Sequence, residues 1–257
     1  MFGTDGCALI GMVHLLPLPG SPGWGGNLQV IKDRAQRDTE KLLEGGCHGV
    51  LVENMGDLPY LKGHVAEETL CAMTLITQSV VEFGAPVGVQ VLAAANAQAL
   101  AIATTTGARF IRVEGFAYAH VADEGWIDAC AGPLLRKRTA LGSQVQIWAD
   151  IQKKHSAHAV TADLSIQDLA EGATFSGADV LVVTGPATGS AARVQDVVHA
   201  KTSGRPIAVG SGINSSNVSE FGDIASALIV GSHLKTEGNW RNPVDIERVR
   251  DLANRVR

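Results

Sequence analysis

The sequence predicts a single (β/α)8 barrel, and three observations support this fold class. Short apolar, β-branched runs alternate with longer stretches of helical composition through all 257 residues. Eight such runs begin at a mean spacing of about 31 residues, the size of one βα repeat. No Ser- or Pro-rich linker divides the chain, so residues 1–257 are expected to form one domain.

The expected strands all have the length of a barrel strand. They lie at residues 8–14, 49–53, 86–92, 109–114, 146–152, 179–184, 206–209 and 227–230. Strict βα alternation implies parallel strands with right-handed crossovers, and eight units match a closed barrel. A doubly wound sheet would have about five or six strands and a G-x-G-x-x-G turn after the first, and the sequence has neither.

Helix signals fill the intervening stretches. Asn27 is expected to cap the first helix, and Ser165, with Asp168 three residues on, is expected to cap another. Asn242 and Pro243 are expected to open the last helix. Glycines recur just before the expected strands, which is typical of helix stops.

Composition excludes several classes of protein. Lys and Arg total 21 against 26 Asp and Glu, so nucleic acid is not an expected partner. Four widely spaced cysteines and an N-terminus without a basic, apolar leader favour a reducing cytoplasmic location. Residues 84–108 carry no charge and are long enough to span a bilayer, but their Pro, Asn, Gln and Thr content favours a buried strand and helix.

Two glycine-rich loops predict a phosphate site. Barrels commonly bind phosphate after strands seven and eight, where this chain has Gly210, Ser211 and Gly212, and then Gly231 and Ser232. Glycines let backbone N–H groups approach an anion, and the two hydroxyls add donors. Ordinary tight turns would carry the same residues, but two such loops at these positions favour a phosphorylated small molecule as ligand.

Two further features belong to this phosphate hypothesis. A helix beginning near Asn214 or Ser215 would direct its positive end at the anion. Lys235 is either an auxiliary positive charge or a solvated lysine after the last strand.

Ionisable residues gather near the ends of the expected strands. Because side chains alternate across a strand, Arg112 and Glu114 project into the barrel, either as a salt bridge in a polar layer or as functional groups. Asp150 and Lys154 lie near one strand end, where each can shift the other's pKa toward acid/base catalysis. Glu53, Glu114 and Asp150 are alternatively a Mg²⁺ site completed by water.

Two histidines and one loop complete the candidate site at the mouth of the barrel, which is the opening at the carboxyl ends of its strands. His14 closes the first strand as a catalytic group or a hydrogen-bonded core residue, and His155 is a base, a ligand or a solvated loop residue. Residues 15–26 hold three prolines and Trp24, which favours a lid over the mouth or a structural or oligomer contact.

Four segments carry a family resemblance. Residues 11–22 include GMVHL and PLPGSP, residues 53–59 read ENMGDLP, residues 149–155 include ADI and KH, and VGSG and IVGS begin at residues 209 and 229. Through them nearly the whole chain resembles the BtpA/SgcQ family. The resemblance implies a barrel related to the ribulose-phosphate-binding group. It also implies mouth positions for six residues: Glu53, Asn54, Asp57, Asp150, Lys154 and His155.

The leading hypothesis is an enzyme that acts on a phosphorylated sugar or nucleotide-like metabolite by isomerisation, aldol-type cleavage or hydrolysis. The two glycine loops would hold the phosphate, while Asp150 and Lys154, with Glu53 or Glu114, would move protons. The alternative is a non-catalytic assembly factor for photosystem I biogenesis, the role behind the family name. A homo-oligomer is compatible with either hypothesis.

Overall fold

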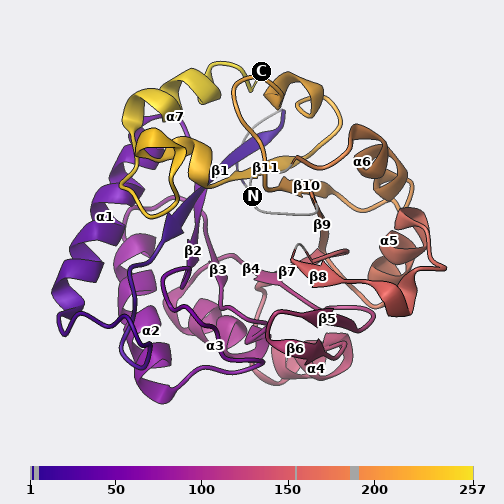
Figure 1. Cartoon of the computed structure of the whole chain (residues 1–257), viewed down its shortest axis with the longest axis horizontal. Helices are drawn as coiled ribbons and strands as arrows, with labels where there is room; N and C mark the ends of the chain where they lie inside the picture. The colour runs from indigo at the N-terminus through magenta and orange to yellow at the C-terminus, as the bar shows by residue number, and fades with distance from the viewer. Residues whose placement is uncertain (1, 3–5, 154, 186–190, 257) are drawn as a thin grey trace.

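Eight parallel strands close a barrel, which confirms the (β/α)8 class (Figure 1). The computed structural model describes residues 2, 6–153, 155–185 and 191–256. The barrel strands are β1 (Ala8–His14), β2 (Gly49–Glu53), β3 (Val87–Gln90), β4 (Phe110–Val113), β7 (Gln146–Asp150), β9 (Val180–Thr184), β10 (Ile207–Gly210) and β11 (Ala227–Val230). β11 pairs with β1 and closes the ring.

Helices surround the barrel and cover the outward faces of its strands (Figure 1). They are α1 (Leu28–Glu44), α2 (Glu67–Val81), α3 (Asn96–Thr106), α4 (Ala131–Ala140), α5 (Ile166–Phe175), α6 (Val194–Lys201) and α7 (Ile246–Ala253). Two expected caps are confirmed: the Asn27 side chain accepts hydrogen bonds at the start of α1, and Ser165 forms a capping box with Asp168 at α5. No helix in the described part of the chain is long and apolar enough to cross a membrane.

Two expected helix starts are wrong. The last helix is capped by Asp245, whose side chain accepts from the next backbone amides, while Asn242 donates to the Thr236 carbonyl instead. After β10 the described chain forms only a short 3₁₀ turn (Val218–Glu220) in place of a helix beginning near Asn214. There, the Asn214 and Asn217 side chains bond to nearby backbone amides, an alternative to helical pairing.

A small antiparallel sheet at the mouth was not expected from the sequence. It consists of β5 (His120–Ala122), β6 (Gly125–Ile127) and β8 (Ser156–Ala157), in the order β6-β5-β8. Strands of two or three residues are too short to show the alternation by which strands are identified. The sheet joins the loop after β4 to the loop after β7, and so brings two segments distant in sequence to one side of the mouth.

The barrel interior changes from apolar to polar toward the carboxyl ends of its strands. Phe110 and Trp148 stack inside with ring centroids 4.2 Å apart. Two residues further along the same strands, Arg112 and Asp150 occupy the same inward face, as the alternation predicted. Ile111 belongs to the outer core between strands and helices. The polar interior therefore begins just below the mouth.

Candidate functional site

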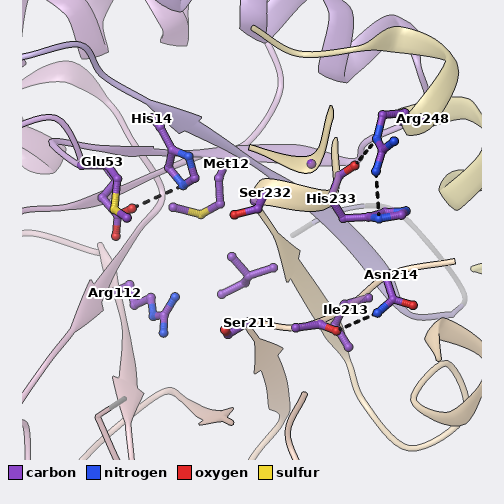
Figure 2. A pocket seen from close by; sticks show the side chains of 15 residues that line it. Met12, His14, Glu53, Arg112, Ser211, Ile213, Asn214, Ser232, His233 and Arg248 are labelled. Carbon is purple, nitrogen blue, oxygen red and sulfur yellow. Dashed lines mark hydrogen bonds and ion pairs between the residues drawn. The ribbon is translucent and has the colours of Figure 1, made fainter. Parts of the chain in front are cut away.

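Three neighbouring strands place polar side chains in one row at the mouth. His14 of β1 lies opposite Glu53 of β2 in the strand register, and Glu53 lies opposite Gln90 of β3. His14 Nε2 is 3.5 Å from Glu53 Oε2, with both side chains 8% exposed (Figure 2). His14 Nδ1 is also 3.4 Å from the carbonyl oxygen of Trp240. The imidazole is thus held between a carboxylate and a backbone carbonyl.

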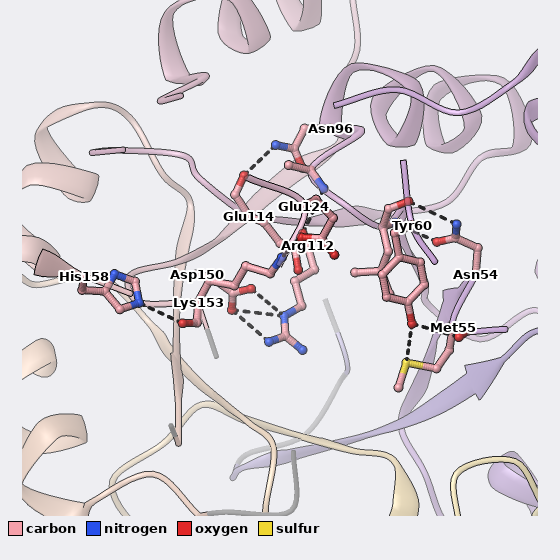
Figure 3. A network of polar contacts seen from close by, with 12 residues as sticks. Asn54, Met55, Tyr60, Asn96, Arg112, Glu114, Glu124, Asp150, Lys153 and His158 are labelled. Carbon is pink, nitrogen blue, oxygen red and sulfur yellow. Dashed lines mark hydrogen bonds and ion pairs between the residues drawn. The ribbon is translucent and has the colours of Figure 1, made fainter. Parts of the chain in front are cut away.

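Arg112 forms a buried ion pair with Asp150 of the adjacent strand. Arg112 Nε lies 3.1 and 3.2 Å from the two Asp150 carboxylate oxygens, and Nη2 lies 3.0 Å from Oδ1 (Figure 3). Burial opposes the arginine charge, but the Asp150 carboxylate outweighs it and the pKa of Arg112 is raised. Asp150 therefore fixes a permanent positive charge beneath the mouth, because the hydrogen bonds hold the guanidinium in one orientation.

Glu114 belongs to a second group of charges, which joins it to Lys153. Lys153 Nζ lies 3.6 Å from Glu114 and 3.2 Å from Glu124, and Glu114 also accepts a hydrogen bond from the Ala94 amide. Burial raises the pKa of Glu114, and Lys153 offsets part of this effect. The sequence reasoning missed Lys153 because strand alternation favoured Lys154, which lies outside the described residues.

The two glycine loops line a cavity of about 230 Å³ together with His14, Glu53 and Arg112, which we call the loop cavity. Ser211, Gly212, Gly231 and Ser232 all border it, and Figure 2 shows the two serine side chains. The backbone at Gly212 has a positive φ of 71°. A Cβ on Gly231 would lie 3.0 Å from the His14 side chain. A Cβ on Gly210, the last residue of β10, would lie 3.3 Å from the Arg112 guanidinium. Glycine therefore lets the backbone of both loops approach the ionisable side chains closely.

Arg248 of α7 supplies a charge to the loop cavity that the sequence reasoning missed. Its Nε donates to the His233 carbonyl at 2.6 Å, and the side chain lines the cavity (Figure 2). No motif surrounds Arg248, so its position depends on how α7 packs.

Lys235 does not supply the auxiliary charge. It is fully buried, where its Nζ donates to the Met12 carbonyl at 2.9 Å and lies 3.3 Å from Asp38. Burial lowers the pKa of Lys235, and Asp38 offsets part of this effect. Neither expectation for Lys235 is therefore correct, because the 3₁₀ turn Ser232–Leu234 directs it into the core between β1 and α1.

Asn54 and Asp57 are buried in the loop that follows β2, and they organise the loops around the mouth. Asn54 Oδ1 accepts from the Leu92 amide at 2.7 Å, and Asp57 Oδ1 accepts from the Leu18 amide at 2.7 Å. Asn54 also donates to Asp57 at 3.0 Å. Since Leu18 belongs to the Pro-rich loop and is buried, this network anchors that loop against the barrel.

His155 and Glu114 line a second cavity beside the loop cavity, and Glu53 borders both. The carboxylates that were alternatives for a Mg²⁺ site face cationic or imidazole groups instead: Asp150 pairs with Arg112, Glu114 with Lys153, and Glu53 with His14. Within the described residues, no group of three or more His, Cys, Asp or Glu side chains is arranged to hold a metal ion. The three described carboxylates are therefore held in three separate pairs.

The fold is a (β/α)8 barrel, and the glycine-rich loops after its last two strands line the loop cavity. The chain belongs to the BtpA family, whose model matches residues 6–257, and the family resemblance is thereby confirmed. It is 44% identical over 256 residues to an uncharacterised mitochondrial protein of Caenorhabditis elegans, covering 96% of this chain and 92% of that protein. It is 39% identical over 246 residues to the photosystem I biogenesis protein BtpA of Synechocystis, covering 94% and 85%.

Solved structures of other barrels resemble the chain in fold. Orotidine 5'-monophosphate decarboxylase from Methanocaldococcus jannaschii matches with a TM-score of 0.60 and 15% identity, covering 98% of this chain and 100% of that one. Phosphoribosyl anthranilate isomerase from Thermus thermophilus matches with a TM-score of 0.56 and 13% identity, covering 96% and 97%. At such identities the likeness shows the fold alone.

Proposed function

We propose that this protein is an enzyme that binds a phosphorylated small metabolite in the loop cavity and acts on it by proton transfer. One observation carries the proposal: the two glycine loops border the same cavity as the imidazole of His14, the neighbouring carboxylate of Glu53 and the guanidinium of Arg112. A group bound at the loops would therefore lie beside ionisable side chains.

The phosphate would bind between the two loops. Backbone N–H groups at Gly212 and Gly231, the hydroxyls of Ser211 and Ser232, and the Arg248 guanidinium supply donors of the kind that recognise phosphate. The names of the two barrel enzymes above refer to phosphorylated compounds, which supports a phosphorylated ligand for this chain as well.

Proton transfer would involve the carboxylates and the imidazole at the mouth. Glu53 borders both cavities and lies beside His14, so this pair can reach a ligand that extends from one cavity to the other. Burial raises the pKa of Glu114, which brings it closer to the range useful for general acid/base catalysis. In this proposal Asp150 orients the Arg112 guanidinium. Lys154 is a further proton-transfer group that only the sequence predicts. Isomerisation, aldol-type cleavage and hydrolysis all use these groups.

The test is a titration with inorganic phosphate, monitored by calorimetry. Arg248→Met should weaken binding about 10- to 100-fold, because a hydrogen bond to a charged group contributes about 1.5–3 kcal/mol. Arg250→Met is the matched control: Arg250 lies on the same helix but forms an exposed ion pair with Glu247, and its replacement should leave phosphate affinity unchanged.

Failure of the wild-type protein to bind phosphate would contradict the proposal. It would favour the assembly role that the name of the Synechocystis relative carries. A cytoplasmic location and self-association stay predictions from the sequence.

A further inference from the structure

The second cavity, which we call the distal cavity, has a volume of about 260 Å³ and adjoins the loop cavity. Glu53 and Met55 border both. The rest of its lining comes from the loop after β2, from β3 and the residues after it, from the loops around the small antiparallel sheet, and from Trp240 and Arg241. A ligand whose phosphate lies at the glycine loops would place its remaining atoms here.

Gln90 is the feature of the distal cavity that points to a ligand. The residue is 3% exposed and lies on the inward face of β3, opposite Glu53. Its Oε1 is buried without a hydrogen-bond partner among the described residues. Leaving a buried acceptor unsatisfied is unfavourable, and a donor on a bound ligand would remove that cost.

The groups around Gln90 are mostly acceptors too. The distal cavity is bordered by four carboxylates, Glu53, Glu114, Asp123 and Glu124, against two permanently basic side chains, Lys153 and Arg241. Both bases are engaged. Lys153 forms ion pairs with Glu114 and Glu124 (Figure 3), and Arg241 lies over the Trp240 ring at 4.2 Å from its centroid.

The Tyr60 hydroxyl adds no free donor to the distal cavity. It donates to the Met55 carbonyl at 2.9 Å (Figure 3). Burial raises the pKa of Tyr60, and the surrounding carboxylates, first Glu53, raise it further. The phenol therefore stays neutral beside an acidic, acceptor-rich wall.

We propose that the distal cavity binds the hydroxyl-bearing end of a sugar monophosphate, with the Gln90 amide oxygen accepting a hydrogen bond from a ligand hydroxyl. The inference rests on the proposed function, because it places the phosphate of the same ligand at the glycine loops. A neutral, donor-rich group matches the acceptors of this cavity. A second phosphate or a carboxylate at that end is repelled, since the carboxylates outnumber the bases and like charges at close range cost free energy.

The experiment compares dissociation constants by calorimetry. The probes are inorganic phosphate, ribose 5-phosphate, fructose 6-phosphate and 3-phosphoglycerate, whose non-phosphate end carries a carboxylate. At least one sugar phosphate should bind the wild-type protein tenfold or more tightly than inorganic phosphate does. This gain in affinity should be absent for 3-phosphoglycerate.

Gln90→Met should reduce that gain to less than threefold and change phosphate affinity less than twofold. The control is Thr77→Val, which removes another buried oxygen that has no hydrogen-bond partner among the described residues; Thr77 lies in α2, lines neither cavity, and its replacement should keep the full gain. If Gln90→Met does not fold, Gln90→Asn is the second variant. Its side chain is one methylene shorter, which moves the amide oxygen away from the ligand hydroxyl, so the gain in affinity for the sugar phosphate should be lost as well.

The inference is overturned if the gain persists without the Gln90 side chain, if no sugar phosphate binds more tightly than phosphate, or if 3-phosphoglycerate binds as tightly as the sugars. In these cases phosphate still binds and the proposed function stands. Absence of phosphate binding to the wild-type protein is a different result, and it overturns the proposed function together with the inference.

Discussion

His120 makes the stability of the protein depend on pH. It begins β5 beside the candidate site, is 5% exposed, and its Nε2 has no hydrogen-bond partner in the described part of the chain. The pKa of His120 is lowered from 6.5 to about 4, first by burial and then by His158 and Lys153, while Glu124 opposes them.

The sign and size of the effect follow from proton linkage. Between pH 6.5 and about 4 the unfolded chain protonates His120 while the folded protein keeps it neutral. The unfolded state binds more protons in this window, so the free energy of unfolding falls as the pH falls. At about 1.36 kcal/mol per pKa unit the full loss is about 3 kcal/mol below pH 4, of which about 2 kcal/mol is reached by pH 5.

Urea denaturation at pH 7.5 and pH 5.0 measures this effect. Between these values the wild-type protein should lose about 2 kcal/mol more unfolding free energy than His120→Leu, which has no titrating group at this position. Thr77→Val, which removes a buried polar atom without removing a titrating group, should keep the wild-type pH dependence. Equal losses in wild type and His120→Leu would refute the assignment of His120 as a buried neutral imidazole.

Two stability predictions concern the barrel interior. Asp150→Leu should lower the free energy of unfolding by about 3–5 kcal/mol, because it removes the carboxylate that neutralises buried Arg112. Adding Arg112→Met should restore most of that loss in urea denaturation, and a double variant as unstable as the single one would contradict this account. Gly88→Ala should cost about 1–3 kcal/mol, since its Cβ would overlap the Phe110 ring and lie 2.8 Å from Leu51. Thermal unfolding at the wild-type midpoint would show that this site has room for a methyl group.

Most of the fold could be predicted because its signals are local. The eight barrel strands lie within a few residues of their expected bounds, and the caps at Asn27 and Ser165 need only neighbouring residues. Predictions failed where side chains competed for the same backbone amides, as at Asn214, where a turn replaces the expected helix. The small antiparallel sheet escaped prediction because strands this short have no measurable period.

The candidate site was only partly predictable. Strand alternation correctly placed Arg112 and Asp150 inside the barrel, and the loop positions brought Ser211 and Ser232 to one cavity. Arg248 carries no signal of its own, because it reaches that cavity only through the packing of α7.

The sequence by itself determined which face of each strand every side chain occupies, since a period of two is a property of the extended backbone. Only the tertiary structure decided the partners of those side chains. Arg112 pairs across strands with Asp150, and Glu114 pairs with Lys153. Lys235 is directed into the core. Partner choice depends on the stagger between strands and on where distant loops return, and these are set by the closure of the whole barrel.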